Sequence, residues 1–281
     1  MLAVGENGAG KTNLLEALHV GTQGFSPRSR NDAQLVRFGA EAARIELAGE
    51  RGGARLEVEL TLRPGDAKRA RLNGATLRAA EQLRSEVATL VFTPARVGVV
   101  KGGPAARRAY FDRTLGRLFP ARAGVPAEYG AAVAQRNAAL RRVAIGASSR
   151  DAVAPWTERV AELGQALVTG RFEAIELLSS PFAERAAELG LPGADLLYEA
   201  EPPSVDALAA RLHEALDRGT TGLGPHLDDV GIAADGRDLR RFGSQGEQRL
   251  AVLSLLLAEA ELLADRGPAP PLLLLDDVLS E

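Results

Sequence analysis

The sequence predicts an α/β fold, in which a parallel sheet is accompanied by an antiparallel β subdomain and an inserted α-helical lobe. Three observations favour this fold. A glycine-rich stretch at 5–12 lies between an apolar stub and a helical pattern. Residues 41–78 alternate between apolar and polar, which is typical of hairpins. The apolar run 272–275 indicates a strand buried on both faces, as in a parallel sheet.

Composition sets limits on function. At 281 residues and 46% hydrophobic content, the chain can bury a core. Its charge of −3, from 34 basic and 37 acidic residues, gives no global attraction to nucleic acid, so DNA binding would need a local patch. Cysteine is absent, which excludes disulfides and thiolate chemistry. With no apolar run of about 18 residues and no signal peptide pattern, we expect a cytoplasmic protein without membrane partners.

Both ends of the chain look cut. Residues 1–4 resemble the end of a buried strand, but they are shorter than the usual strand of about 5–6 residues. Residues 12–18 have a helical pattern, and a Gly/Ser/Pro-rich loop follows at 21–30. Because the chain also stops at Glu281 within an apparent motif, we expect a sequence truncated at both ends.

The β subdomain is predicted from alternation and turns. Segments 44–47 and 55–60 alternate with period two, and Gly52-Gly53 and Asn73-Gly74 supply the turns. A short amphipathic helix is expected at 79–85. The next apolar run, 88–92, predicts another buried strand.

A helical lobe is predicted from Pro104 to about Gly219, where strand signals vanish. Breaks between its helices are expected at five prolines: Pro120, Pro126, Pro155, Pro181 and Pro192. The lobe lacks a long heptad run, so an extended coiled coil is not expected.

The last part of the chain returns to the parallel sheet. A hairpin is expected around Asp235-Gly236, with strands at 230–233 and 238–242, followed by a helix at 245–264. We therefore predict three segments: 1–103, with the glycine-rich loop and β subdomain; 104–220, the helical lobe; and 221–281, with the last helix and strand.

The most specific motif is the phosphate-binding loop G-x-x-x-x-G-K-[ST], which residues 5–12 fit at every fixed position. Glycines allow positive φ, so that backbone N–H groups and a helix N-terminus converge on phosphate oxygens. Lys11 is expected to reach the β- and γ-phosphates of ATP, and the Thr12 hydroxyl to bind Mg²⁺. The predicted ATP-binding residues are Gly5, Glu6, Asn7, Gly8, Ala9, Gly10, Lys11 and Thr12.

Two carboxylates follow the apolar strand 272–275. Asp276 is expected to complete the Mg²⁺ site with Thr12, since a carboxylate suits a hard cation. Asp277 is the candidate catalytic residue, orienting or deprotonating the attacking water. The alternative is that this pair is only a solvated strand end.

The start of the helix at 245–264 has two possible explanations. Ser244 and Glu247 form a capping box, which is sufficient reason for the helix to begin there. A Ser-x-Gly turn also offers a hydroxyl and N–H groups to an anion. In this position Ser244, Gln245 and Gly246 resemble the signature motif of ABC-type ATPases. The resemblance implies that they bind the γ-phosphate of ATP held on a second head, and hence that ATP drives homodimerisation.

Several stretches in order resemble the RecF family of recombination mediators. The matching segments are 91–94, 100–104 with Arg107-Arg108 and Phe111-Asp112, Tyr129 with 135–137, 224–229, 244–249 and 272–281. The resemblance implies an ABC-type P-loop ATPase head with a compact helical lobe. Two departures from the family pattern are Leu227, in place of an arginine, and Glu247, in place of a glutamine.

The resemblance also implies a function: an ATP-dependent DNA-binding protein of recombinational repair and replication. It would act at gapped DNA with mediator proteins and a recombinase, using weak ATP hydrolysis as a switch. A transporter-type ABC subunit and an SMC-like chromosome ATPase are the alternatives. Arg107, Arg108 and Arg136 are candidate contacts to the DNA backbone, although a solvated helix face also explains arginines in such positions.

Overall fold

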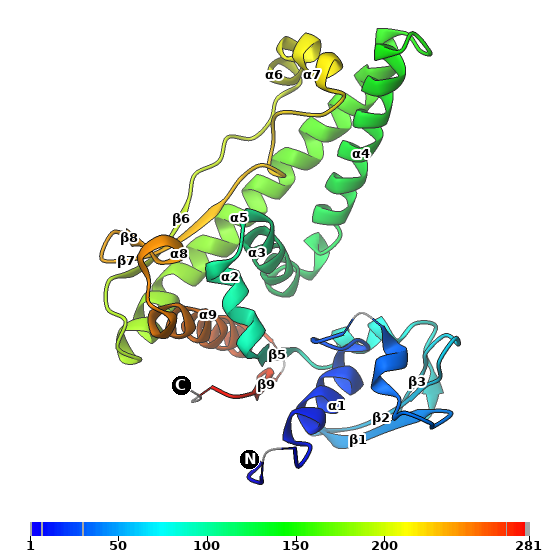
Figure 1. The fold of residues 1–281 in the computed structure, drawn as a ribbon, viewed down its shortest axis with the longest axis vertical. Helices are drawn as coiled ribbons and strands as arrows, with labels where there is room; N and C mark the ends of the chain where they lie inside the picture. Colours follow the sequence, from blue (N-terminus) through cyan, green and yellow to red (C-terminus); the bar gives the residue numbers. More distant parts are fainter. Residues whose placement is uncertain (1, 7, 30, 268, 279–281) are drawn as a thin grey trace. The chain divides into compact units, whose positions relative to one another are not determined.

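The computed structural model describes residues 2–6, 8–29, 31–267 and 269–278. It divides the chain into two compact units, Met1–Arg96 with Ala260–Glu281, and Val97–Glu259. Figure 1 follows the chain in colour from blue to red. Among the described residues, none of the helices is long and apolar enough to span a membrane.

The first unit contains α1, two sheets and short 3-10 helices. Its elements are α1 Lys11–Gln23, η1 Asp32–Leu35, β1 Ala43–Arg51, β2 Ala54–Leu62, β3 Arg69–Leu72, β4 Ala75–Thr76, η2 Ala80–Ser85, β5 Thr89–Phe92 and β9 Leu272–Leu275. The turn η3, Pro94–Val97, lies at its boundary. Residues 2–4 form no strand, so the expectation of one there is wrong. A strand needs a hydrogen-bonded neighbour, and no described strand pairs with these residues.

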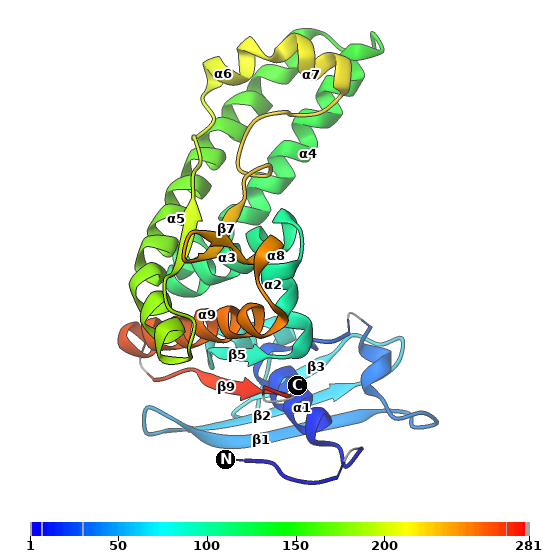
Figure 2. The same ribbon diagram turned by 60° about the vertical axis from the view of Figure 1, so that its left-hand side comes forward.

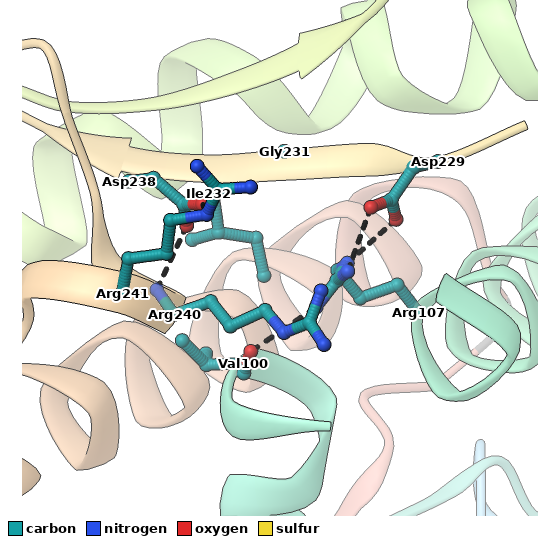
Figure 3. A pocket seen from close by; sticks show the side chains of 8 residues that line it. All are labelled: Val100, Arg107, Asp229, Gly231, Ile232, Asp238, Arg240 and Arg241. Atoms are coloured by element: carbon teal, nitrogen blue, oxygen red, sulfur yellow. Dashed lines mark hydrogen bonds and ion pairs between the residues drawn. The ribbon is translucent and has the colours of Figure 1, made fainter. Parts of the chain in front are cut away.

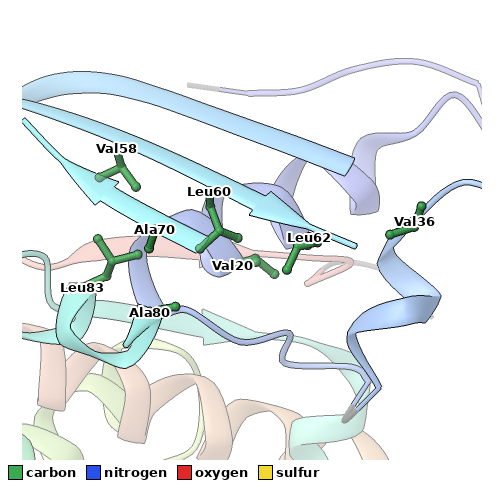
Figure 4. Close-up of a cluster of buried hydrophobic side chains, with 8 residues drawn as sticks. All are labelled: Val20, Val36, Val58, Leu60, Leu62, Ala70, Ala80 and Leu83. Atoms are coloured by element: carbon green, nitrogen blue, oxygen red, sulfur yellow. The ribbon is translucent and has the colours of Figure 1, made fainter. Parts of the chain in front are cut away.

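The predicted hairpins are confirmed. Strands β1 to β4 form an antiparallel sheet in sequence order, with Leu47 opposite Val58. Asn73 and Gly74 take the positive φ angles, 48° and 81°, that a tight turn requires. Alternate residues of β2 face a core made with α1 and η2 (Figure 4). This cluster is Val20, Val36, Val58, Leu60, Leu62, Ala70, Ala80 and Leu83.

Strands β5 and β9 pair in parallel, with Val91 opposite Leu274, which confirms the predicted parallel strands. All four residues of β5 are buried. In β9 only Leu274 is buried, whereas Leu273 and Leu275 are 36% and 43% exposed. The expectation that β9 is covered on both faces is therefore not met among the described residues.

The second unit is mainly helical. Its elements are α2 Gly98–Lys101, α3 Pro104–Leu118, η4 Pro120–Arg122, α4 Val125–Ala144, η5 Arg150–Val153, α5 Ala154–Glu188, β6 Ala194–Tyr198, α6 Val205–Ala210, α7 Leu212–Arg218, β7 Val230–Ala234, β8 Arg237–Asp238, α8 Leu239–Phe242 and α9 Gln245–Arg266, whose last turns belong to the first unit. Helices α4 and α5 pack side by side, as Figure 1 and Figure 2 both show.

Three expectations for this unit need correction. Pro181 does not end a helix, because it lies inside the 35-residue α5. The neighbouring Leu178 and Phe182 are fully buried there. Their packing offsets the cost of a helix-interior proline, about 3 kcal/mol. The predicted all-helical lobe also contains β6, which pairs with β7. The expected strand 238–242 is mostly helix α8, because the Asp238 carboxylate caps it, accepting from the Arg240 N–H at 2.8 Å.

Candidate functional site

The P-loop backbone has the geometry of a phosphate cradle. Gly8 and Gly10 have φ of 85° and 91°, and a side chain at either position would be strained. Helix α1 starts directly after Gly10 with no side-chain cap and no acidic residue in its first turn. Its N-terminal N–H groups are thus available to an anion. The predicted contact Asn7 lies outside the described residues.

Lys11 closes over the loop that precedes it. Its ammonium donates to the carbonyl oxygens of Gly5 at 2.6 Å and Glu6 at 2.9 Å. The Ala9 N–H donates to the same Glu6 carbonyl at 3.2 Å. These bonds hold Lys11 and Ala9 against Gly5 and Glu6. A bound phosphate would take the place of the two carbonyls as the partner of the Lys11 ammonium.

The Thr12 hydroxyl and the Asp276 carboxylate lie next to each other. Thr12 Oγ1 donates to Asp276 Oδ1 at 3.2 Å. Asp276 is placed by the parallel sheet, since its N–H donates to the Phe92 carbonyl at 3.0 Å, one step beyond the last pair of β5 and β9. Thr12 and Asp276 are the residues that would hold a Mg²⁺ ion, since a hydroxyl and a carboxylate suit a hard cation.

Asp277 follows at the turn after β9. Its φ is 55°, in the left-handed region that asparagine and aspartate occupy more readily than other side-chain-bearing residues. The strand therefore directs Asp276 and Asp277 differently. This conformation fits distinct roles for the two carboxylates, and the catalytic role of Asp277 stays a prediction.

The predicted signature residues lie in the second unit, exposed at the start of α9. The capping box is confirmed: the Ser244 N–H donates to Glu247 Oε2 at 2.7 Å, and the Glu247 N–H donates to Ser244 Oγ at 3.2 Å. These hydrogen bonds lower the pKa of Glu247. Gln248 is buried and its amide donates to the Leu239 and Gly243 carbonyls, which ties α8 to the loop of Ser244, Gln245 and Gly246.

Arg107 is not at the surface. It is 3% exposed, and its guanidinium pairs with both Asp229 oxygens at 2.7 Å. It also donates to the Val100 and Gly102 carbonyls, at 3.1 and 2.8 Å. Four of its five N–H groups are thus engaged inside the protein, so the fold holds Arg107 in place through internal partners.

Arg136 is enclosed as well, at 1% exposure. Its guanidinium donates to the hydroxyls of Thr157 and Thr221, both at 3.0 Å, and to the Leu208 carbonyl at 3.4 Å. Burial lowers the pKa of Arg136. A side chain held in this way cannot reach a DNA backbone at the surface. Arg108 is half-buried, and its predicted contact with DNA stays a prediction.

The sequence reasoning missed what the segment 224–229 does. Arg108 donates to the Asp228 carbonyl at 2.6 Å, and the Tyr198 hydroxyl to the Asp228 carboxylate at 2.8 Å. Arg171, 2% exposed, donates to the Pro225 carbonyl at 2.8 Å and pairs with Asp112. The segment is therefore a junction between α3, α5 and β6. The Arg-Arg and Asp-Asp pairs in the sequence were the available signal.

His226 is part of this junction. Its Nδ1 lies 2.8 Å from the Tyr129 hydroxyl and its Nε2 lies 2.9 Å from the Thr221 carbonyl. A carbonyl can only accept, so Nε2 carries the proton and Nδ1 accepts from Tyr129. Burial lowers the pKa of His226 and raises that of Tyr129, which keeps both groups neutral.

The comparisons with known proteins agree with this architecture. An AAA domain family (AAA_23) matches residues 2–96. The DNA replication and repair protein RecF of Synechococcus sp. (strain JA-3-3Ab) is 38% identical, over 100% of this chain and 78% of its own length. The RecF protein of Heliobacterium modesticaldum is 35% identical over 99% of this chain and 78% of its own length.

Solved structures give the same result. A structure described as the recombination mediator protein RecF-ATP in the RecFOR pathway superposes with a TM-score of 0.85 at 26% identity, covering 97% of this chain and 77% of that one. An Smc head domain from Pyrococcus furiosus, 17% identical over 97% of this chain and 74% of that chain, has a TM-score of 0.52 and shows the fold alone.

The fold, with the P-loop beside the parallel strands β5 and β9, defines an α/β ATPase head of the ABC type. It has an antiparallel β subdomain and an inserted helical lobe. Within that class, the relatives above decide the family. The chain belongs to the RecF family of DNA replication and repair proteins.

Proposed function

We propose that this protein binds Mg·ATP at the P-loop and uses it to form a homodimer that holds gapped DNA during recombinational repair and replication. The observation that carries the proposal is the contact of Thr12 with Asp276, which brings a P-loop hydroxyl and a strand-end carboxylate to 3.2 Å. A hydroxyl and a carboxylate brought together in this way are the protein ligands that Mg²⁺ beside a nucleotide's phosphates uses.

ATP binding would engage residues 5–12 as a unit. Backbone N–H groups of the loop and of α1 would hold the phosphates, and Lys11 would move its charge from two carbonyls to the phosphate oxygens. Thr12 and Asp276 would hold Mg²⁺, which would offset the negative charge of the phosphates. Asp277 would orient the attacking water in a slow hydrolysis that resets the switch.

Dimerisation would complete the site. Ser244, Gln245 and Gly246 are exposed, and α9 directs the positive end of its dipole towards their loop. The solved RecF structures that resemble this chain are described with ATP and in the RecFOR pathway. By that likeness we assign the chain DNA, mediator proteins and a recombinase as partners, and the cytoplasm as its compartment.

The test is sedimentation velocity of the full chain with and without Mg·ATP, followed by ATP turnover with gapped DNA and with intact duplex. We expect a dimer only with Mg·ATP, and faster turnover on gapped DNA. A monomer at saturating Mg·ATP together with turnover indifferent to DNA would contradict the proposal. Asp277→Asn serves as the matched variant, because it should keep the dimer and slow the turnover.

A further inference from the structure

The second unit has a small hollow beside α8, with a volume of about 100 Å³. Figure 3 shows its lining side chains. They are Val100, Arg107, Asp229, Gly231, Ile232, Asp238, Arg240 and Arg241. Three of these are cationic and two are anionic, so the hollow has one positive charge in excess.

The excess charge belongs to Arg240. Both oxygens of Asp229 accept from Arg107, and Asp229 Oδ1 also accepts from the Val230 N–H. One oxygen of Asp238 accepts from the Arg240 N–H of the backbone, and the other lies 3.8 Å from Arg241. In the part of the chain that the structure describes, the Arg240 guanidinium has no ion pair, although it lines the same small hollow as the guanidinium of Arg107.

The backbone that carries Arg240 is held in place. Asp238 caps α8, Leu239 is 1% exposed, and the Leu239 carbonyl accepts from the Gly243 N–H at 3.1 Å and the buried Gln248 amide at 2.8 Å. The other cation, Arg107, is locked by Asp229 and two carbonyls. A fixed Arg107 and an Arg240 on a held backbone therefore bring two like charges to one hollow, where an anion would stabilise them.

We propose that this hollow is a phosphate-binding site, in which Arg240 supplies the free charge, Arg241 a second cation at the edge, and Arg107 the fixed wall. A tetrahedral phosphate oxyanion suits the forked donors of arginine, which bind such groups in pairs. The source of the phosphate rests on the proposed function: it is carried either by the DNA backbone or by a nucleotide. The site itself does not depend on that function.

The direct test uses inorganic phosphate and the full chain. The Arg107 Nε–H, buried and bonded to Asp229, is the NMR reporter, titrated with phosphate at constant ionic strength against chloride. We expect a saturable shift with a midpoint on the order of 1–10 mM. Arg240→Gln should raise that midpoint at least about tenfold, and Arg240→Lys should raise it less. A linear, unsaturable shift, or the same midpoint in Arg240→Gln, would overturn the proposal.

Arg142→Gln is the matched control, since Arg142 is an exposed arginine for which the structure likewise describes no ion pair. It removes the same charge from α4, away from the hollow, and should leave the titration unchanged. If both variants lose phosphate binding equally, net charge rather than a site is responsible and the proposal is wrong.

Arg240→Gln and its control Arg142→Gln also identify the molecule that carries the phosphate. If Arg240→Gln alone weakens binding to gapped DNA and lowers its salt slope by about one, the phosphate is that of DNA. If it alone raises the ATP concentration needed for dimerisation, the phosphate is that of the nucleotide. If it changes neither, the hollow is not used and the proposal falls. Should the wild type neither dimerise nor bind DNA, the proposed function fails, while the phosphate titration still decides the site.

Discussion

Thr12 and Asp276 are 264 positions apart in the sequence, and their side-chain oxygens are 3.2 Å apart in the structure. The pairing of β5 with β9 produces this proximity, because it fixes the Asp276 N–H on the Phe92 carbonyl. α1, which carries Thr12, packs against both of these strands. The two halves of the candidate Mg²⁺ site are thus positioned by one small parallel sheet.

A pair of substitutions at Thr12 tests this site. Thr12→Ser keeps the hydroxyl and should bind Mg·ATP as the wild type does. Thr12→Val keeps the shape but lacks the oxygen, so we expect Mg·ATP affinity to fall about 10- to 100-fold. Titration of a fluorescent nucleotide with Mg²⁺ and with EDTA measures this. Equal losses in both conditions would show that Thr12 acts on the fold and not through the metal.

Lys11 should affect nucleotide binding with or without Mg²⁺. In Lys11→Met the phosphates lose a charge-assisted partner, and ATP affinity should fall about 10- to 100-fold in both conditions. Lys11 makes its bonds to Gly5 and Glu6 at an exposed position, so the free energy of unfolding should change by less than about 1 kcal/mol. Urea unfolding of the variant is the control, and a large loss of stability would remove the affinity change as evidence.

The sequence was informative where the pattern is local. The P-loop, the hairpins around Gly52-Gly53 and Asn73-Gly74, and the capping box of Ser244 each depend on a few neighbouring residues, and the structure has each turn and cap where its residue types predict it. Helix α9 ends two residues beyond its expected end, as helix ends generally vary. Helix α1 continues to Gln23, five residues beyond the expected end and into the segment 21–30 expected as a loop. The division into segments 1–103, 104–220 and 221–281 stays a prediction.

The errors arose where long-range packing outweighs local preference. Pro181 breaks a helix in isolation, but α5 continues because Leu178 and Phe182 bury its face. Arg107 and Arg136 are arginines in a lobe rich in basic residues, a pattern that is also typical of a DNA-binding surface. Only the fold reveals that Asp229, 122 positions from Arg107, draws that arginine inside. No periodicity in one sequence reports such a distant partner.

A mixing experiment tests the composite site. Lys11→Met damages the P-loop of each chain, and Ser244→Arg places a bulky cation in the signature loop, so neither variant alone should form an ATP dimer. When the two are mixed, one of the two sites combines an intact P-loop with an intact signature loop. We expect ATP-dependent heterodimers and up to about half of the wild-type turnover. An inactive mixture, with both variants folded, would contradict binding across two copies.

The pair of Arg107 and Asp229 should govern stability. Arg107→Leu leaves the Asp229 carboxylate and two carbonyls without a donor, and because Asp229 is partly solvated we expect a loss of about 1–3 kcal/mol in the free energy of unfolding. The double variant Arg107→Leu/Asp229→Leu should recover part of it. Arg108→Gln, which removes a half-exposed side chain bonded to one carbonyl, should cost less than about 1.5 kcal/mol.

Measurements of DNA binding distinguish an arginine that contacts DNA from one that stabilises the fold. Arg107 lines the proposed phosphate hollow beside Arg240, so folded Arg107→Leu should lose no more affinity for gapped DNA than Arg240→Gln does. Arg108→Gln should bind gapped DNA more weakly than the wild type, with a flatter salt dependence. Chemical denaturation and a DNA titration over several salt concentrations supply the measurements. If folded Arg107→Leu lost much more DNA affinity than Arg240→Gln, Arg107 would contact DNA directly, beyond its place in the hollow.

His19 should make the first unit sensitive to acid. It is 3% exposed on α1, its Nδ1 lies 2.9 Å from the Phe25 carbonyl, and burial lowers its pKa from 6.5 to about 4. The unfolded chain therefore binds a proton at a higher pH than the folded one. The contribution of the neutral His19 ring to the free energy of unfolding is fully present above pH 6.5. It declines as the pH falls towards 4 and is lost below that, a change of about 3 kcal/mol in total.

The measurement is the free energy of unfolding between pH 7.5 and 4.5, with hydrogen exchange of the β1 and β2 amides as the local reporter. His19→Gln keeps a polar side chain of similar reach without this titration, so its stability should fall less steeply with acid than that of the wild type. His213→Gln, at an 86% exposed side chain, is the control and should follow the wild type. Because the carboxylates are common to all three proteins, the difference between their curves isolates His19. Parallel curves for His19→Gln and the wild type would show that the folded ring accepts its proton without cost.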